Sequence, residues 1–319
     1  MPDVPERSEI VRRLGDVTDR YGEWTYDVPL PHGIWTKGNL EVPHTRLKRI
    51  VQAACDIAGK PLSSCRILDL GCLEGQFTAE FALQGADALG VEVRTANFEK
   101  AKLLEWALAL PNLAFIQEDV RNITVEKHGE FDVVVCSGLL YHLPAKDAFD
   151  LVRSMFAMAQ RIVIIDTHIA LAPETNVTID GETYSGRYFV EHRQDATDAE
   201  KAASLWASAD NTTSFWFTRP SLVNIMQRAG FSTVYECFTP AHLNYGRPGL
   251  ECPDRGTFVG VKGSPVKLAT SPAANGIRED WPEGTLAYAP PPPRLLRAAT
   301  RLGRLIGLPG VARSARGRR

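Results

Sequence analysis

The stretch Arg66–Phe77, RILDLGCLEGQF, decides the fold of this chain. A strand-like apolar run leads into Gly71, and Gly75 follows four residues later, just before a helical pattern. Gly71 suits a turn conformation closed to other residues, and Gly75 would let the backbone approach a ligand closely. The N–H groups at the start of the following helix bind anionic groups. The stretch therefore predicts a site for a nucleotide-like ligand where the strand ends.

Asp69 lies beside this glycine turn and narrows the choice of ligand. A carboxylate there would repel a pyrophosphate, but it suits a ligand that carries an ammonium group and whose own carboxylate meets nearby N–H donors. An amino acid joined to adenosine has both charges. The glycine spacing also lacks the GxGxxG of dinucleotide sites and the GxxxxGK of a P-loop.

Strand-like and helical patterns alternate on both sides of this stretch. The strand-like runs are RILDL, ALGVEV, LAFIQED, FDVVVCSG, RIVIID, STVYEC and GTFVGVK. Near-continuous apolar strands separated by helices predict an α/β fold with a doubly wound, mostly parallel sheet covered on both faces. Ligands of such sheets bind at the carboxyl ends of the strands, which favours the same place as the glycine turn.

The chain divides into four segments by composition. Residues 1–44 mix polar residues with aromatics and turn formers, which predicts an ordered but irregular N-terminal arm. The α/β pattern fills residues 45–262, and residues 169–217 interrupt it with a polar and aromatic segment. Such long loops in compact domains are usually functional, so we expect a substrate lid, helical around Ala199–Ala207. Residues 263–319 form a Pro- and Arg-rich C-terminal tail.

Charge and composition exclude several classes of protein. The chain has 36 basic and 38 acidic residues, so a nucleic-acid partner is not favoured. It has no run of ~18 apolar residues and no apolar region at its N-terminus, which predicts a cytoplasmic protein. Its six cysteines lack CxxC spacing and are expected to be buried thiols. A basic amphipathic stretch in the tail predicts weak contact with an anionic membrane surface, contact with a partner, or a disordered tail.

Several motifs in order resemble those of the class I S-adenosylmethionine-dependent methyltransferases over about residues 45–262. DLGCLEG resembles the family's first motif, although Cys72 and Leu73 depart from its usual small residues, and FDVVVCSGLLYHL resembles the fourth-strand motif. Glu92 matches the acid that binds the ribose hydroxyls, and Asp119 matches the residue that binds the adenine amino group. The resemblance implies a Rossmann-like sheet of seven strands, S-adenosylmethionine as cofactor, and a cofactor site made of Asp69, Gly71, Cys72, Gly75, Glu92, Asp119, Val120 and Ser137.

Two histidines follow strands at the edge where the acceptor is expected. Methyl transfer to a hydroxyl requires an aligned nucleophile and removal of its proton, so His142 and His168 are the catalytic candidates, with Asp166 placed to orient His168. Each histidine could instead only pack and hydrogen-bond. Asp166 and His168 could also bind a divalent cation together with Glu191 and His192, but the spacing shows no known metal signature and a metal is not favoured.

The N-terminal segment distantly resembles one found in relatives of the wobble-uridine tRNA methyltransferases. It would close over the donor through Trp24, Tyr26 and Trp35, although core packing of the arm is the simpler account of these aromatics. The favoured function is O-methylation of a small molecule, a sugar or glycosylated metabolite. A tRNA-modifying transferase, a non-catalytic donor-binding subunit and a dehydrogenase are the alternatives. The sequence leaves the oligomeric state open.

Overall fold

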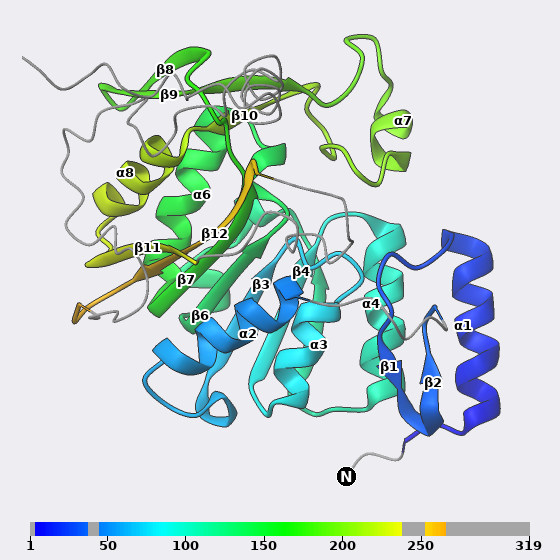
Figure 1. Cartoon of the computed structure of the whole chain (residues 1–319). Coiled ribbons are helices and arrows are strands. Elements are labelled where there is room, and N and C mark those ends of the chain that lie inside the picture. The colour runs from blue at the N-terminus through cyan, green and yellow to red at the C-terminus, as the bar shows by residue number, and fades with distance from the viewer. Residues whose placement is uncertain (1–3, 38–44, 238–252, 266–319) are drawn as a thin grey trace, which may run out of the picture. The chain divides into compact units, whose positions relative to one another are not determined.

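A seven-stranded, mostly parallel sheet forms the centre of the domain, as the sequence predicted (Figure 1). Its strands, in spatial order, are β11 (Thr233–Cys237), β12 (Arg255–Val261), β7 (Ala159–His168), β6 (Phe131–Ser137), β3 (Arg66–Leu70), β4 (Asp87–Glu92) and β5 (Leu113–Gln117). Strand β12 is antiparallel to both of its neighbours. This computed structural model describes residues 4–37, 45–237 and 253–265, which all belong to one unit of the chain, residues 1–283.

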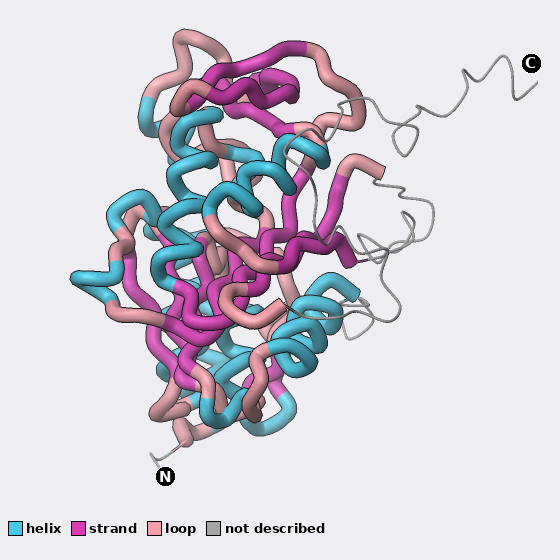
Figure 2. The backbone as a smooth tube through the Cα atoms, turned by 90° about the vertical axis from the view of Figure 1, so that its left-hand side faces the viewer, coloured by secondary structure: helices cyan, strands magenta, loops and turns pink. Residues whose placement is uncertain are grey.

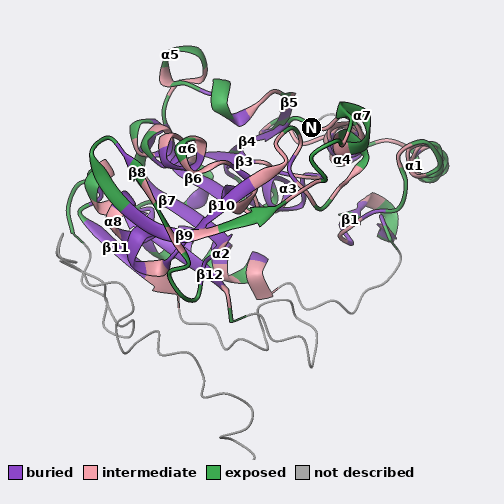
Figure 3. Cartoon of the chain, turned by 90° about the horizontal axis from the view of Figure 1, so that it is seen from above, coloured by how far each residue is buried: buried purple, intermediate pink, exposed green. Residues whose placement is uncertain are grey.

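Helices cover both faces of the sheet (Figure 2). On one face lie α2 (Thr45–Ile57), α3 (Gln76–Leu83) and α4 (Thr95–Leu108); on the other lie α6 (Ala145–Met158) and α8 (Arg219–Ala229), with the short α5 (Val125–His128) near β6. Along β6, Val133 and Val135 pack with the first group and Val134 with the second. Burial on both faces explains why the strands are continuously apolar (Figure 3).

The N-terminal segment is more regular than the sequence analysis predicted. It contains α1 (Arg7–Tyr21) and a hairpin of β1 (Pro29–Leu30) and β2 (Ile34–Trp35). Helix α1 packs along α4 through Ile10, with Leu14 and Val17 partly buried beside it. The prediction of an irregular arm was wrong because this apolar stripe, at helical spacing, was hidden among charged residues.

The segment inserted after β7 is built on a three-stranded antiparallel sheet, which the sequence analysis missed. The sheet contains β8 (Thr175–Ile179), β9 (Glu182–Val190) and β10 (Thr213–Phe217), and α7 (Asp198–Ala203) lies between β9 and β10. Tyr184, Phe215 and Phe217 pack into the core shared with α6 and α8. The inserted segment therefore has a rigid base, and its loops extend from there.

Other features are local. Short 3₁₀ turns occur at Pro31–Gly33, Leu62–Ser64, Val120–Asn122 and Leu140–His142. Cys65, Cys72 and Cys136 are buried thiols as predicted, whereas Cys55 is exposed. No helix within the described ranges is long and apolar enough to cross a membrane. The basic amphipathic stretch predicted in the C-terminal tail lies outside the described residues.

Candidate active site

A cavity of about 780 Å³ opens at the carboxyl ends of β3, β4, β5 and β6. This is where a doubly wound sheet is expected to bind its ligand, and the volume lies in the range of small-molecule sites. The cavity gathers nearly all of the residues expected to bind the donor. Its walls include Asp69, Gly71, Cys72, Glu92, Asp119, Val120 and Ser137.

Gly75 does not line this cavity, and the structure gives it a different role from the one expected. Its φ of +88° lies in the left-handed region, and a Cβ at this position would lie 2.6 Å from Cζ of Phe115. Gly71, with φ +69°, lines the cavity as expected. Gly75 therefore allows α3 and its loop to pack against β5.

Asp69 and Arg46 place opposite charges in the same cavity. Asp69 is buried, and its Oδ2 accepts a hydrogen bond of 2.7 Å from Oγ1 of Thr78. Burial raises the pKa of Asp69 to about 6 despite this hydrogen bond, and the Glu92 carboxylate adds to the rise, while the Arg46 guanidinium opposes it. A carboxylate that is costly to ionise and a nearby guanidinium suit the ammonium and carboxylate of an amino acid.

Glu92 joins the glycine loop to the end of β4. Its Oε2 accepts a 3.0 Å hydrogen bond from the backbone N of Leu73, and its Oε1 accepts one of 2.8 Å from the backbone N of Arg94. Burial raises the pKa of Glu92, and the two N–H groups oppose that rise. A carboxylate has about four acceptor positions, so Glu92 retains capacity for the hydroxyls of a ribose.

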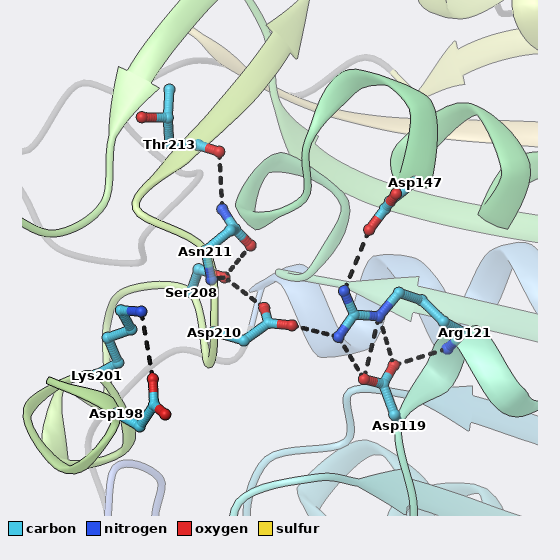
Figure 4. Close-up of polar contacts among 9 residues, drawn as sticks. All are labelled: Asp119, Arg121, Asp147, Asp198, Lys201, Ser208, Asp210, Asn211 and Thr213. Atoms are coloured by element: carbon cyan, nitrogen blue, oxygen red, sulfur yellow. Dashed lines mark hydrogen bonds and ion pairs between the residues drawn. The ribbon is translucent and has the colours of Figure 1, made fainter. Parts of the chain in front are cut away.

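Asp119 does not stand alone in the cavity wall, because Arg121 binds its carboxylate (Figure 4). The Arg121 Nε lies 3.0 Å from Oδ1 and 3.1 Å from Oδ2 of Asp119. The same guanidinium contacts Asp147 at 3.2 Å and pairs with Asp210 of the inserted segment. Burial would raise the pKa of Asp119, but Arg121 lowers it below its usual value. A ligand's amino group would share Asp119 with Arg121, a pairing that the sequence analysis did not find.

Glu74 of the glycine loop fixes the N-terminal segment over the cavity. Its carboxylate is fully buried and accepts hydrogen bonds from the backbone N of Thr25 at 2.8 Å and of Tyr26 at 3.2 Å. Nζ of Lys100, also buried, completes the arrangement at 2.9 Å. A charge this deeply buried is stable only when paired, so Glu74 and Lys100 tie α3, α4 and the N-terminal segment together.

The N-terminal segment and α4 each contribute a polar side chain that the sequence analysis missed. Oδ2 of the buried Asp27 and both amide atoms of the buried Asn97 have no hydrogen-bond partner among the described residues, and both side chains line the cavity. Buried polar atoms of this kind are uncommon and indicate a ligand or water. Of the three aromatic contacts expected here, the cavity is lined by Trp24 and Tyr26 but not by Trp35.

His142 lines the cavity at the end of the 3₁₀ turn after β6, and its ring is paired with a buried carboxylate. Nδ1 lies 3.0 Å from Oε2 and 3.1 Å from Oε1 of Glu191. The side chain of Glu191 is inaccessible to solvent, and it also accepts hydrogen bonds from Ser214 Oγ at 2.6 Å and the Ser208 backbone N at 2.8 Å. Burial would raise the pKa of Glu191, but His142 and these donors lower it.

Asp166 and His168 occupy a different environment. Asp166 is fully buried, with Nε of Arg255 at 2.7 Å and Nη2 of Arg49 at 3.2 Å from its carboxylate. Burial would raise the pKa of Asp166, but Arg255 and the other cations hold it at about 2. His168 does not line the main cavity; its ring stacks on Trp216 at a centroid distance of 4.9 Å. Arg255 lies between the two, with Nη1 3.3 Å from Nε2 of His168.

The four side chains considered for a divalent cation do not form one cluster. Glu191 is bound to His142, and Nε2 of His192 lies 2.7 Å from the carbonyl oxygen of Ser208. Asp166 is enclosed by arginines, apart from both. Within residues 4–37, 45–237 and 253–265, no group of three histidine, cysteine or acidic side chains is close enough to hold a metal ion.

Residues 41–236 match the profile of a family described as a methyltransferase domain. The chain belongs to this methyltransferase family. Similar curated proteins include ubiquinone biosynthesis O-methyltransferases. That of Acinetobacter baylyi is 31% identical over 99 residues, which cover 31% of this chain and 40% of that protein. That of Photorhabdus laumondii is 33% identical over 104 residues, covering 31% and 39%. The chain thus spans less than half the length of these relatives.

Solved structures of another protein share the fold of this domain. The N-terminal domain of EvdMO1 with S-adenosylhomocysteine (SAH) bound is 24% identical and has a TM-score of 0.61, covering 82% of this chain and 98% of that one. The same domain in the presence of SAH and D-fucose gives a TM-score of 0.60 with the same identity and coverage. The likeness covers most of this chain and agrees with the predicted Rossmann-like architecture.

Proposed function

We propose that this methyltransferase uses S-adenosylmethionine to methylate a hydroxyl group of a small molecule, a sugar or glycosylated metabolite. The observation that carries the proposal is the pair of His142 and buried Glu191 in the cavity wall. O-methyltransferases among the similar proteins, and a solved domain of the same fold prepared with SAH and D-fucose, support the choice of oxygen and of a sugar.

The cavity residues fit the cofactor group by group. Asp69 would bind the ammonium group of the cofactor, and Arg46 would bind its carboxylate, because both side chains line the same cavity. Glu92 has acceptor capacity for the ribose hydroxyls. Asp119 and Val120 would contact the adenine, the first with its carboxylate and the second with its apolar side chain. Bound adenosylmethionine supplies a methyl group already activated on a sulfonium.

His142 is the proposed general base. Because Glu191 is ionised and contacts Nδ1, the neutral imidazole carries its proton on Nδ1, and Nε2 presents a lone pair. Nε2 accepts the proton of the acceptor hydroxyl as the oxygen attacks the methyl group. Glu191 then stabilises the positive charge on the imidazole, as a buried carboxylate does for a catalytic histidine.

Asp166 and His168 have a structural role in this proposal. A carboxylate with a pKa of about 2, surrounded by Arg255, Arg49 and Thr257, is a poor proton acceptor at neutral pH. It instead joins β7 to β12 and α2. His168 packs between Tyr141 and Trp216 and so supports the turn that carries His142.

Matched histidine variants test this assignment. We expect His142→Ala to lower kcat by about 100-fold or more while the Kd for SAH stays within about twofold. His168→Ala should retain more turnover than His142→Ala, because its ring lies outside the cavity and only supports the turn that carries His142. The acceptor panel contains sugars, glycosylated phenols and free phenols, with labelled adenosylmethionine, and NMR of the product identifies the methylated atom.

Two results would contradict the proposal. One is a methyl group found on nitrogen or carbon rather than oxygen. The other is labelling of tRNA with no labelling of any small molecule, which would favour the wobble-uridine type of transferase suggested by the N-terminal segment. If His142→Ala turned over as fast as the wild type, His142 would not be the general base, but the proposed methyltransferase activity would still stand.

A further inference from the structure

We propose that the loop Leu205–Asp210 of the inserted segment forms part of the adenosine-binding site, and that it couples donor binding to the alignment of His142. This inference rests on the proposed use of an adenosine-containing donor. It differs from the sequence-based expectation, in which the inserted segment was a lid over the acceptor. The loop lines the same cavity as Glu92, Asp119 and Val120.

Two arginines hold this loop, and each lies two residues after a proposed donor-binding carboxylate. Arg94 follows Glu92, and its Nη2 lies 2.7 Å from the carbonyl oxygen of Ala207 while Nη1 lies 3.0 Å from that of Lys201. Arg121 follows Asp119 and pairs with Asp210 (Figure 4). The loop is therefore fixed at the ribose end by one arginine and at the adenine end by the other.

The loop also brings an exposed aromatic ring to the cavity. Trp206 lines the cavity although its side chain is 68% exposed, and Val93, next to Glu92, is 43% exposed. Covering exposed apolar side chains at a cavity wall with a flat ring removes apolar surface from water, and the face of a tryptophan stacks well on a purine. Adenine enclosed by these residues would be covered on the side away from the sheet.

Ser208 connects this end of the cavity to the proposed base. Its backbone N donates to Oε2 of Glu191 at 2.8 Å, and its carbonyl oxygen lies 2.7 Å from Nε2 of His192. Glu191 in turn holds Nδ1 of His142. Displacement of the loop would remove a hydrogen bond from Glu191, so a loop positioned by bound adenosine also positions the carboxylate that orients the base.

The contacts of Arg121 suit a loop that must open for the donor to enter. Its guanidinium serves Asp119, Asp147 and Asp210, and all of these side chains are partly exposed. Exposed ion pairs are individually weak, so the contacts of Arg121 can break at small cost. A ligand that contacts both Asp119 and the loop would then favour the closed arrangement over the open one.

Binding measurements in the absence of acceptor test the inference independently of methyl transfer. We expect Arg121→Gln and Asp210→Asn each to raise the Kd for SAH, and for its fragment 5′-methylthioadenosine, by about three- to tenfold in calorimetry. The double variant should bind both ligands no more weakly than Arg121→Gln alone, because Asp210→Asn removes an ion pair that Arg121→Gln has already removed. Adding the fragment should change the fluorescence of the wild type, and Trp206→Phe should abolish most of that change.

The matched control is Arg153 and Asp180, another exposed pair, 3.2 Å apart, that joins α6 to the inserted segment. Arg153→Gln and Asp180→Asn should leave the Kd for both ligands unchanged. A second readout is the pH profile of turnover. Arg121→Gln should shift this profile by disturbing the hydrogen bond from the Ser208 backbone N to Glu191, whereas the control variants should leave the profile unchanged.

Two outcomes would overturn the inference. In the first, Arg121→Gln and Asp210→Asn bind SAH and its fragment like wild type and change only the KM for the acceptor, which would make the loop an acceptor lid. In the second, Trp206→Phe retains the full fluorescence change. The Kd and fluorescence measurements do not depend on the proposed O-methyltransferase activity, because they contain no acceptor.

Discussion

Acidification from about pH 7 to about pH 5 should weaken the binding of SAH about tenfold through Asp69 alone. Burial raises the pKa of this carboxyl to about 6 in the empty cavity, so about nine in ten molecules are protonated there at the lower pH and about one in ten at the higher. The ligand's ammonium group favours the ionised carboxylate, so binding must release that proton. Affinity is therefore full above the pKa and is lost as the pH falls through it.

Calorimetry in buffers of different ionisation enthalpy would measure both the Kd and the protons released. The chosen range lies below the ordinary pKa of an α-amino group, near 8, so the ligand keeps its charge throughout. Asp69→Asn is the control, and it should bind more weakly at every pH with a flatter profile. Glu92, whose pKa is also raised by burial, adds a contribution of the same sign. An affinity independent of pH in the wild type, or an equally steep profile in Asp69→Asn, would refute the reasoning.

Other variants test the framework around the cavity. Lys100→Met leaves the buried Glu74 without its cation and should lower the free energy of unfolding in urea by about 3–5 kcal/mol; a loss below about 1 kcal/mol would contradict the pairing. Gly75→Ala should reduce the Tm, and Phe115→Leu should restore only part of it, because the clash is relieved while the strain of φ +88° persists. Asp166→Asn should lower the free energy of unfolding by about 2–3 kcal/mol at neutral pH, because the folded state holds the pKa of this carboxyl at about 2. The stabilisation is present above the pKa of the unfolded chain and is lost as the pH falls through about 2. Equal stability of the variant and the wild type in guanidinium would show that the arginines do not need this carboxylate.

Much of the sheet could be predicted because its signals are local. The central strands of the parallel sheet are buried on both faces, so they read as apolar runs, and the glycine turn after β3 identifies the first of them. The expected donor residues meet in one cavity because parallel strands end at the same edge of the sheet. Asp69, Glu92, Asp119 and Ser137, which the motif resemblance identified one by one, line that cavity together.

The parts that the sequence analysis missed depend on contacts between distant residues. Helix α1 is stabilised by packing its apolar stripe against α4. The antiparallel sheet of the inserted segment depends on the pairing of β8, β9 and β10. His168 looked equivalent to His142, since both follow a strand. They differ because the ring of His142 faces the cavity while that of His168 packs on Trp216.

The sequence by itself determined the strands of the central sheet and the glycine turn, because these follow from periodicity and from residues close together in the chain, and its motifs indicated the carboxylates at the strand ends. Only the tertiary structure decided what each charge faces. Glu191 reaches His142 across 49 positions and Asp210 reaches Arg121 across 89, so no local pattern records either pair. The first pairing gives His142 a buried carboxylate partner, and the second holds the inserted loop at the Asp119 end of the cavity.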